Sequence, residues 1–454
     1  MVKLSISQSV AYNRNLKNVL PGGVHYSFRM PWESKQISLV RGRGSRVWDL
    51  DGNEYLDFFA KFGANILGHN NPEYNQALID TLQRVSSANL GDIDAEAAEA
   101  VCAHIDSADM VRFSLSGTEA VQNALRLARG YTGRNRFVRF QGHYHGNADN
   151  TLGGRVGDLD HPVPEEDPGD LYSTEGKAAG VLKDQSFLIP WNDADLLESL
   201  LERSHEEIAA LLMEPICING GGLMPAAGYL ERVRALCDRY GVVLIFDEVI
   251  TGFRVGLGGA QRLLGVLPDL TTLGKAMAGG ALPVSAIAGR REIMKLYENR
   301  KVVHGGTFNG YLLGLAAVKA TIDLLARDGG RAYERMGEGM GRIHSALLGE
   351  AEKNGLALRM SGVPGAGVFS PAPSSADGPR AGMIAQYLGK MIGEAMTEHG
   401  ILVSNANRLY GNISVDESDV ELFQARVGDA FRQVGEFVAK MQGGPPAAAA
   451  ATAS

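Results

Sequence analysis

Two apolar runs separated by a helical pattern constrain the fold of this chain more than any other feature. Residues 208–213 and 242–246 each have the length of a buried strand, and the apolar residues of 230–240 follow helical spacing. Because both runs are apolar throughout instead of alternating, each strand should be covered on both faces. The connections are short. The pattern therefore predicts a strand–helix–strand unit in a parallel sheet covered by helices.

The same alternation of strand and helix patterns extends from about residue 70 to residue 320. Residues 137–140 form another strand pattern, after a helix that begins near Gly117. Nearer the N-terminus, apolar and aromatic residues at 47–48 and 55–56 flank an Asp-Gly turn at 51–52, which predicts a β-hairpin. A chain of 454 residues also exceeds what one hydrophobic core normally supports. We therefore expect an α/β protein with a large and a smaller unit.

Composition excludes several classes of protein. The net charge of −8 gives no basic field that would attract nucleic acid, and no stretch approaches the length of about 18 apolar residues that a membrane span needs. The three cysteines lack CxxC spacing, and residues 1–17 lack an apolar signal segment, so we expect a reduced cytoplasmic protein. The 57 glycines have no fixed period and indicate tight turns or close backbone approach to a ligand.

Two segments depart from the alternating pattern. Residues 151–176 carry seven acidic residues, one arginine and several prolines and glycines, so they form either a functional lid or a disordered loop. Residues 443–454 are rich in glycine, proline and alanine and predict a frayed, disordered tail.

Three local patterns carry candidate chemistry. Ser116 and Glu119 form a capping box at a helix start, where free N–H groups could bind a phosphate; a simple helix cap is the alternative. Asp247 ends a buried strand and could hold a protonated ring nitrogen, or it could be a solvated strand end. Lys275 has an apolar, glycine-rich frame that would make its amine nucleophilic, whereas a lone lysine is normally a surface residue. In this order, the three patterns are what pyridoxal 5'-phosphate (PLP) needs.

A set of ordered blocks extends this interpretation to a protein family. The blocks are Pro21-Gly22-Gly23-Val24, Ser116-Gly117-Thr118-Glu119-Ala120, Tyr144-His145-Gly146, Glu214-Pro215, Phe246-Asp247-Glu248-Val249, Thr251-Gly252-Phe253-Arg254, Thr271-Thr272-Leu273-Gly274-Lys275 and Gly306-Thr307-Phe308-Asn309-Gly310. Between about residues 21 and 317, the chain resembles the class III (fold type I) PLP-dependent aminotransferases. Within them, it is most similar to the glutamate-1-semialdehyde 2,1-aminomutase group.

The resemblance implies the fold type I architecture. In it, a large domain has a mainly parallel seven-stranded sheet covered by helices, and a smaller α+β domain is built from both chain ends. We expect residues 1–70 to be the N-terminal segment of the small domain and 71–325 to form the large PLP-binding domain. Residues 326–442 would complete the small domain, and 443–454 would be the disordered tail.

The resemblance also implies roles for residues at the matching positions. Lys275 would form the Schiff base with PLP and move the proton between cofactor and substrate carbons. Asp247 would pair with the pyridine nitrogen. Ser116, Gly117 and Thr118 would bind the phosphate group.

Four further contacts follow from the same resemblance. Tyr144 and Val249 would lie on opposite faces of the cofactor ring, and Asn219 would lie near its phenolic oxygen. Thr307 would reach the cofactor of the neighbouring subunit, which implies a homodimer with shared active sites. From the residues alone, Tyr144 could instead be a core aromatic side chain and Asn219 a turn residue.

Substrate recognition would depend on arginine. Arg29 matches the arginine that captures a substrate carboxylate in the aminomutase group, and a gapped alignment gives Arg408 where that group carries an acid. A planar guanidinium suits a carboxylate because it donates two parallel hydrogen bonds. The alternatives are that Arg29 is a surface arginine and that Arg408 points to solvent.

The sequence departs from the aminomutase pattern at several positions. Phe62 replaces a tryptophan, Leu115 replaces an asparagine, and Tyr311-Leu312 replaces Asn-Pro after Gly310. Residues 151–176 also do not resemble the aminomutase gating loop.

These features lead to a choice of reactions. The leading expectation is an aminotransferase that moves an amino group between a carboxylate-bearing amino acid and a keto acid or aldehyde, in two half-reactions on one cofactor. The alternative is a glutamate-1-semialdehyde 2,1-aminomutase, which keeps one substrate through both halves. A non-catalytic cofactor-binding protein is a third hypothesis, which the joint presence of Lys275 and Asp247 disfavours. We expect no metal, nucleic acid or membrane partner.

Overall fold

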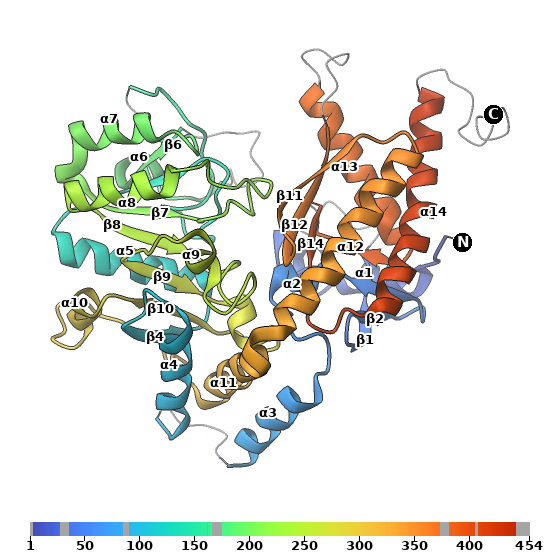
Figure 1. Cartoon of the computed structure of the whole chain (residues 1–454), viewed down its shortest axis with the longest axis horizontal. Coiled ribbons are helices and arrows are strands. Elements are labelled where there is room, and N and C mark those ends of the chain that lie inside the picture. Colours follow the sequence, from blue (N-terminus) through green and yellow to red (C-terminus); the bar gives the residue numbers. More distant parts are fainter. Residues whose placement is uncertain are drawn as a thin grey trace.

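A seven-stranded sheet organises the larger lobe of the computed structural model, which describes residues 3–27, 36–84, 90–160, 162–165, 175–372, 381–404 and 407–441 (Figure 1). The strand order is β4-β10-β9-β8-β7-β5-β6. Only β10 runs antiparallel to its neighbours among these strands, so the predicted mainly parallel sheet is confirmed. The strands are β4 (Met110–Ser114), β5 (Arg136–Phe140), β6 (Ser186–Ile189), β7 (Ile208–Met213), β8 (Val243–Asp247), β9 (Leu270–Leu273) and β10 (Ser285–Gly289).

The predicted strand–helix–strand unit is also confirmed. It consists of β7, α8 (Tyr229–Tyr240) and β8, and its second strand begins at Val243 instead of Val242. Leu211 and Leu212 lie in two different core clusters because successive strand residues point to opposite faces of the sheet. Both faces are covered, which explains why the strand is apolar throughout.

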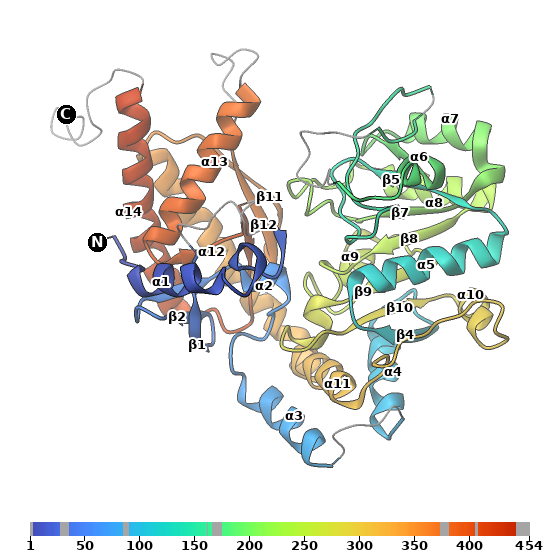
Figure 2. The same cartoon turned by 180° about the vertical axis from the view of Figure 1, so that it is seen from behind.

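Helices cover the two faces of the sheet. The helices α7 (Ala194–Ser204) and α8 pack on one face, and α5 (Gly117–Thr132) packs on the other (Figures 1 and 2). Three more helices form a cluster beside β4 and β10: α3 (Pro72–Arg84), α4 (Ile93–His104) and α11 (Leu312–Ala326).

Both chain ends build the second lobe. A four-stranded sheet joins β1 (Leu39–Arg43), β2 (Arg46–Asp49) and β3 (Glu54–Asp57) to β13 (Ile401–Leu402). Since β13 pairs in parallel with β3, the N- and C-terminal segments share one sheet, as the small-domain expectation required. The predicted hairpin is confirmed as β2–β3.

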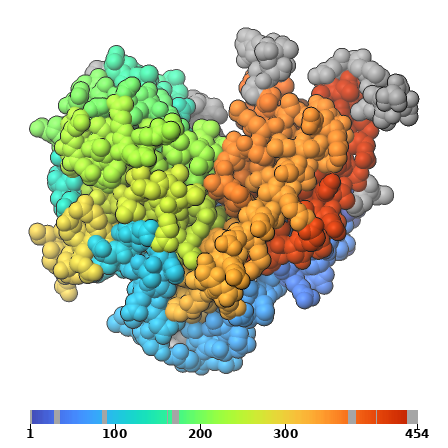
Figure 3. Space-filling view, viewed as in Figure 1, coloured from blue at the N-terminus to red at the C-terminus, as the bar shows by residue number. Residues whose placement is uncertain are grey.

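A second, three-stranded sheet and three long helices complete this lobe. The sheet contains β11 (Leu358–Val363), β12 (Ala366–Pro371) and β14 (Arg408–Tyr410). The helices are α12 (Arg331–Lys353), α13 (Ala381–Glu398) and α14 (Glu417–Met441). Their apolar faces meet in a core that includes Leu56, Phe369 and Phe431. Figure 3 shows the two lobes as packed surfaces, with the middle of the chain in green and yellow and its C-terminal part in orange and red.

Short elements connect these parts. They are α1 (Ser7–Leu16), η1 (Pro21–Gly23), α2 (Ala60–Gly63), α6 (Val181–Gln185), η3 (His205–Glu207), α9 (Gly259–Leu264), η4 (Lys275–Ala278), α10 (Arg291–Met294), η5 (Lys295–Tyr297) and η6 (Arg327–Gly330). Among the helices of the described ranges, none has the length and apolar character that crossing a bilayer requires.

Two expectations fall partly or wholly outside the described residues. Of the segment 151–176, residues 161 and 166–174 lie outside them, and the rest contains one isolated bridge between Arg155 and Glu165. The tail 443–454 lies outside them entirely. The domain boundaries near residues 70 and 325 stay predictions.

Candidate active site

A cavity lies at the carboxyl ends of the parallel strands, where ligands bind in open α/β sheets. Its walls come from segments that follow five strands in turn: β4, β5, β7, β8 and β9. The described residues that line it are Gly117, Thr118, Tyr144, His145, Gly146, Glu214, Asn219, Asp247, Val249, Ile250, Thr251 and Lys275. Of the predicted cofactor contacts, Ser116 and Thr307 are not among them.

The start of helix α5 forms one wall. The predicted capping box is present: Ser116 Oγ accepts from the Glu119 N–H, and Glu119 Oε2 accepts from the Ser116 and Leu115 N–H groups at 3.0 and 2.9 Å. Glu119 therefore takes up the N–H groups of Leu115 and Ser116, while Gly117 and Thr118 line the cavity. The positive end of the helix dipole at this position favours an anion.

Two glycines keep this wall close to its neighbours. A Cβ at position 117 would lie 3.1 Å from Val249 Cγ1. At Gly146, which has a φ of +93°, a Cβ would lie 2.5 Å from Thr118 Oγ1. Glycine at both positions thus allows the segments after β5 and β8 to pack closely against the helix start.

Asp247 ends strand β8 and is held in place by three contacts. His145 Nδ1 lies 2.8 Å from Asp247 Oδ2, and Thr272 Oγ1 and the Val249 N–H donate to Oδ1 at 3.0 and 3.2 Å. The aspartate is only 6% exposed, which is little for a carboxylate. This excludes a freely solvated strand end and aims a fixed carboxylate at the cavity.

The adjacent carboxylate has a different surrounding. Glu248 is fully buried and accepts from Thr251 Oγ1, the Ala260 N–H and the Gln261 side chain. Burial raises the pKa of Glu248. Because neighbouring strand-end residues point in opposite directions, Glu248 organises the following loop and only Asp247 faces the cavity.

Two site residues had no role in the sequence interpretation, although the resemblance blocks contain them. Glu214 accepts from the Tyr144 N–H and from Asn219 Nδ2 at 2.8 and 2.9 Å, so it links the segments after β5 and β7. Burial raises the pKa of Glu214. His145 is 1% exposed and contacts Asp247, as described above. The blocks around Tyr144 and Glu214 indicate that these segments belong to the site. They do not indicate that the His145 side chain contacts Asp247 or that the Glu214 side chain contacts Asn219.

Lys275 follows β9 and lines the cavity. Its φ of +44° is unfavourable for a residue with a side chain and is typical of functional sites where the surroundings enforce it. Burial lowers the pKa of its amine to about 8, from an ordinary value of 10.5. Asp247 and Glu214 act against this shift, whereas Arg408 and Arg254 add to it. With a pKa of about 8, roughly a tenth of the amine is neutral at pH 7 and about half at pH 8.

Of the two arginines predicted to bind substrate, the structure describes Arg408 but not Arg29. Arg408 is 9% exposed, and it donates from Nε to Ile218 O and from Nη2 to Asn219 O, at 3.2 and 2.8 Å. It therefore lies beside a cavity wall and does not point to solvent. Arg29 lies outside the described residues. Thr307 is exposed on the single chain and does not reach this cavity.

The residues present fit PLP. The helix start suits a phosphate, the fixed Asp247 carboxylate suits a protonated pyridine nitrogen, and the desolvated Lys275 amine suits an aldehyde carbon. When bound, PLP supplies an electron sink for the negative charge that develops on the substrate carbon. The fold and the site together define a fold type I PLP-dependent enzyme.

Comparison with known proteins identifies the family. A family model described as class-III aminotransferase matches residues 30–417, and the chain belongs to this family. A glutamate-1-semialdehyde 2,1-aminomutase from Syntrophobacter fumaroxidans is 39% identical over 78% of this chain and 81% of its own length. An omega-transaminase structure from Sphaerobacter thermophilus is 30% identical, covers 94% of this chain and 97% of its own, and has a TM-score of 0.84.

A further structure, described as a transaminase with PLP bound, is 28% identical with a TM-score of 0.83, covering 95% of this chain and 98% of its own. The chain is thus a class III PLP-dependent enzyme. The aminomutase relative supports the alternative reaction better than the leading expectation of transamination.

The lowered pKa of Lys275 leads to a first prediction. In the cofactor-free protein, the rate at which an acylating reagent labels Lys275 should rise with pH around a midpoint near 8, because the neutral amine is the reactive form. Peptide mass spectrometry measures this, and Lys353, whose side chain is 67% exposed, provides an internal reference. A Lys275 midpoint at its ordinary value of 10.5 would contradict the prediction.

Proposed function

We propose that this protein moves the amino group within one substrate, in the reaction of the glutamate-1-semialdehyde 2,1-aminomutases. The observation that carries the proposal is the identity of 39% with such an aminomutase over 78% of the chain. The cavity geometry supports PLP-dependent amino-group transfer in general, because a lysine with a lowered pKa and a fixed carboxylate line the same cavity.

In this proposal, Lys275 and Asp247 are the catalytic residues. Lys275 Nζ holds the cofactor and then accepts and returns the proton of the substrate carbon, which requires an amine that is neutral near pH 7–8. Asp247 would pair with the pyridine nitrogen of PLP. His145 and Thr272 keep the Asp247 carboxylate at a constant position, through contacts of 2.8 and 3.0 Å.

The remaining predicted cofactor contacts are part of the proposal. The N–H groups of Gly117 and Thr118 would bind the phosphate, with Ser116 capping their helix. Tyr144 and Val249 would lie on opposite faces of the ring. Asn219 would approach the phenolic oxygen, and Glu214 orients its amide at 2.9 Å.

Transamination between two substrates is the second candidate function, and a specific observation favours it. Arg408 is buried beside Asn219 at a position where the aminomutase resemblance leads one to expect an acid. A fixed guanidinium binds a carboxylate firmly, and Arg29 would add a second one. The omega-transaminase that is 30% identical over 94% of the chain also supports this candidate.

One experiment distinguishes the two reactions. With glutamate-1-semialdehyde as the single substrate, an aminomutase gives sustained formation of 5-aminolevulinate, because the amino group returns to the same molecule. An aminotransferase forms at most one product per active site until a 2-keto acid or aldehyde is added. We expect sustained formation, measured by chromatography after rapid quenching. A burst that stops at one product per site and resumes with a keto acid would establish transamination instead.

The role of Asp247 leads to a separate prediction. Asp247→Ala should lower kcat by more than about tenfold, or about 1.4 kcal/mol, because the pyridine nitrogen loses its charged partner. The cofactor should remain bound through its phosphate and Lys275, as absorbance after gel filtration would report. Asp195→Ala changes a carboxylate that is 86% exposed and provides the control. A smaller loss of kcat in Asp247→Ala would mean that the acid has another role.

Thr307 leads to a prediction about assembly. We propose that its exposed segment reaches the cofactor of a second subunit, so the active protein would be a homodimer with shared sites. Active enzyme sedimentation should then give twice the chain mass of 48.5 kDa. An active species with the mass of one chain would refute the proposal.

A further inference from the structure

Arg254 is a fully buried cation that is bound by backbone carbonyl groups instead of carboxylates. Its Nε donates to Gly63 O at 2.6 Å, and its Nη1 donates to Gly411 O at 2.7 Å and Gly365 O at 3.2 Å. The side chain is 0% exposed. Within the described ranges, no ion pair joins this guanidinium to an acidic side chain, and its Nη2 has no hydrogen-bond partner.

The three carbonyl groups come from the lobe that both chain ends build. Gly63 ends the turn α2 and follows Phe62, and Gly411 lies three residues after Arg408. Gly365 lies in the connection between β11 and β12. Arg254 itself belongs to the loop that begins with Asp247 at the end of β8. One side chain therefore connects this loop of the large lobe to three segments of the other lobe.

The segments around Arg254 pack closely against it and against each other. Gly63 has a φ of +81°, and a Cβ there would lie 2.8 Å from the Tyr410 ring and 3.1 Å from Arg254 Nε. A Cβ at Gly365 would lie 2.8 Å from the carbonyl oxygen of Arg254. Tyr333 donates its hydroxyl hydrogen to Phe253 O at 2.7 Å. A side chain larger than hydrogen at Gly63 or Gly365 would therefore push these segments apart.

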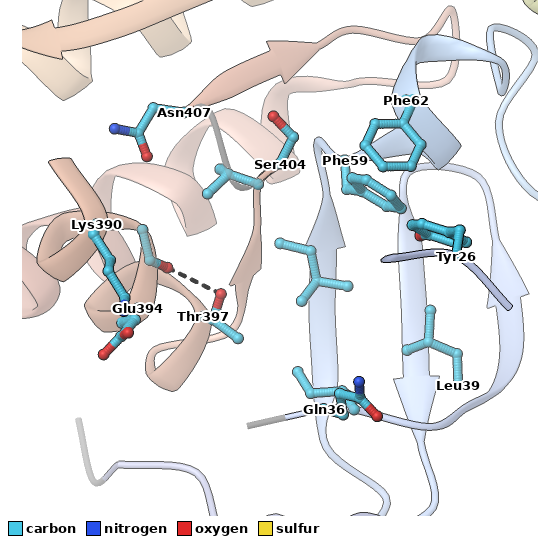
Figure 4. A pocket seen from close by; sticks show the side chains of 14 residues that line it. Tyr26, Gln36, Leu39, Phe59, Phe62, Lys390, Glu394, Thr397, Ser404 and Asn407 are labelled. Atoms are coloured by element: carbon cyan, nitrogen blue, oxygen red, sulfur yellow. Dashed lines mark hydrogen bonds between the residues drawn. The ribbon is translucent and has the colours of Figure 1, made fainter. Parts of the chain in front are cut away.

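Residues next to these segments also line a cavity in the lobe that both chain ends build (Figure 4). Phe62 contacts Tyr26 and Phe59 edge to face, with ring centroids 5.6 and 4.6 Å apart, and Asn407 lies on the opposite side. Asn407 directly precedes Arg408 in strand β14. The hydrogen bonds of Arg254 therefore hold both the turn with Phe62, on one side of this cavity, and strand β14, next to its other side. Among the described residues, Arg254 itself lines neither this cavity nor the candidate active site.

Stability alone does not explain an arginine at this position. Burial of a cation without an acidic partner is costly, and well-packed apolar residues often replace buried ions without loss of stability. Burial lowers the pKa of Arg254 to about 10, so the group remains charged at neutral pH. Its charge lowers the pKa of Lys275 together with Arg408, against Asp247 and Glu214, which raise it.

We propose that Arg254 is a positioning residue that holds the substrate side of the active site, the Phe62 turn and the strand with Arg408, against the loop that carries Asp247. The assignment of Arg408 to the substrate side rests on the proposed function. The residues proposed to bind the phosphate and the pyridine nitrogen of PLP, Gly117, Thr118 and Asp247, belong to the large lobe, and within the described ranges none of them is hydrogen-bonded to Arg254 or Arg408. Its loss should therefore affect substrate binding more than cofactor binding.

The test compares Arg254→Met with Arg254→Lys. In Arg254→Met, KM for the carboxylate substrate should rise about tenfold or more, while the dissociation constant of PLP changes by less than about threefold. Hydrogen exchange of residues 60–66 and 408–412 should become faster in the cofactor-free protein. The labelling midpoint of Lys275 should move to higher pH, because a positive charge has been removed. Arg254→Lys keeps the charge but loses donors, so it should preserve the midpoint and only partly restore KM.

Arg134 provides a matched control. Its Nη1 also donates to three backbone carbonyl oxygens, those of Ile208, Tyr240 and Gly241, at 3.0–3.2 Å. These carbonyl groups lie at the amino-terminal ends of β7 and β8, whereas the candidate active site lies at the carboxyl ends. Arg134→Met should lower the melting temperature without raising KM, changing exchange at 60–66 or moving the Lys275 midpoint.

Three results would overturn the proposal. They are an equal loss of PLP and substrate affinity in Arg254→Met, an unchanged exchange rate at 60–66 and 408–412, and the same KM increase in Arg134→Met. If Arg254→Met does not fold, Gly63→Ala disturbs the same contact while the arginine remains, and the same KM pattern and faster exchange are expected. If neither proposed reaction is catalysed, the exchange and labelling experiments still decide the role of Arg254.

Discussion

The burial of Lys275 in the cavity, which lowers the pKa of its amine, is the constraint on which the site depends. An amine in water would be protonated and unreactive near neutral pH, and burial lowers its pKa to about 8. That burial depends on a cavity lined by segments from five strand ends, and these ends meet because the strands are parallel. The reactivity of the Lys275 side chain therefore depends on the topology of the whole sheet.

Two opposing groups of charges surround this amine. Asp247 and Glu214 stabilise its protonated form, and Arg408 and Arg254 stabilise its neutral form. Most of these charges are held by hydrogen bonds to backbone groups or to buried side chains, so they cannot reorient to solvate the amine. An environment of fixed dipoles and charges is what gives electrostatic effects their strength in an active site.

The features predicted correctly from the sequence are local ones. The β2–β3 hairpin, the capping box at Ser116 and the strand–helix–strand unit follow from residues close together in the chain. The contact of His145 with Asp247, and that of Arg254 with Gly63 and Gly411, join residues 102 to 191 positions apart. No spacing rule reports such pairs. Arg408 could be aligned only loosely, because the pattern does not define the strand that carries it.

The pairing of β3 with β13 has a consequence for the order in which the protein assembles. Leu56 finds its partner Ile401 only after nearly the whole chain has been made. During synthesis, the large sheet has all its strands once residue 289 has left the ribosome, whereas the first strands still lack their neighbour. The earliest part of the chain is therefore among the last to acquire its native contacts, and its edge strand remains open to incorrect partners throughout synthesis.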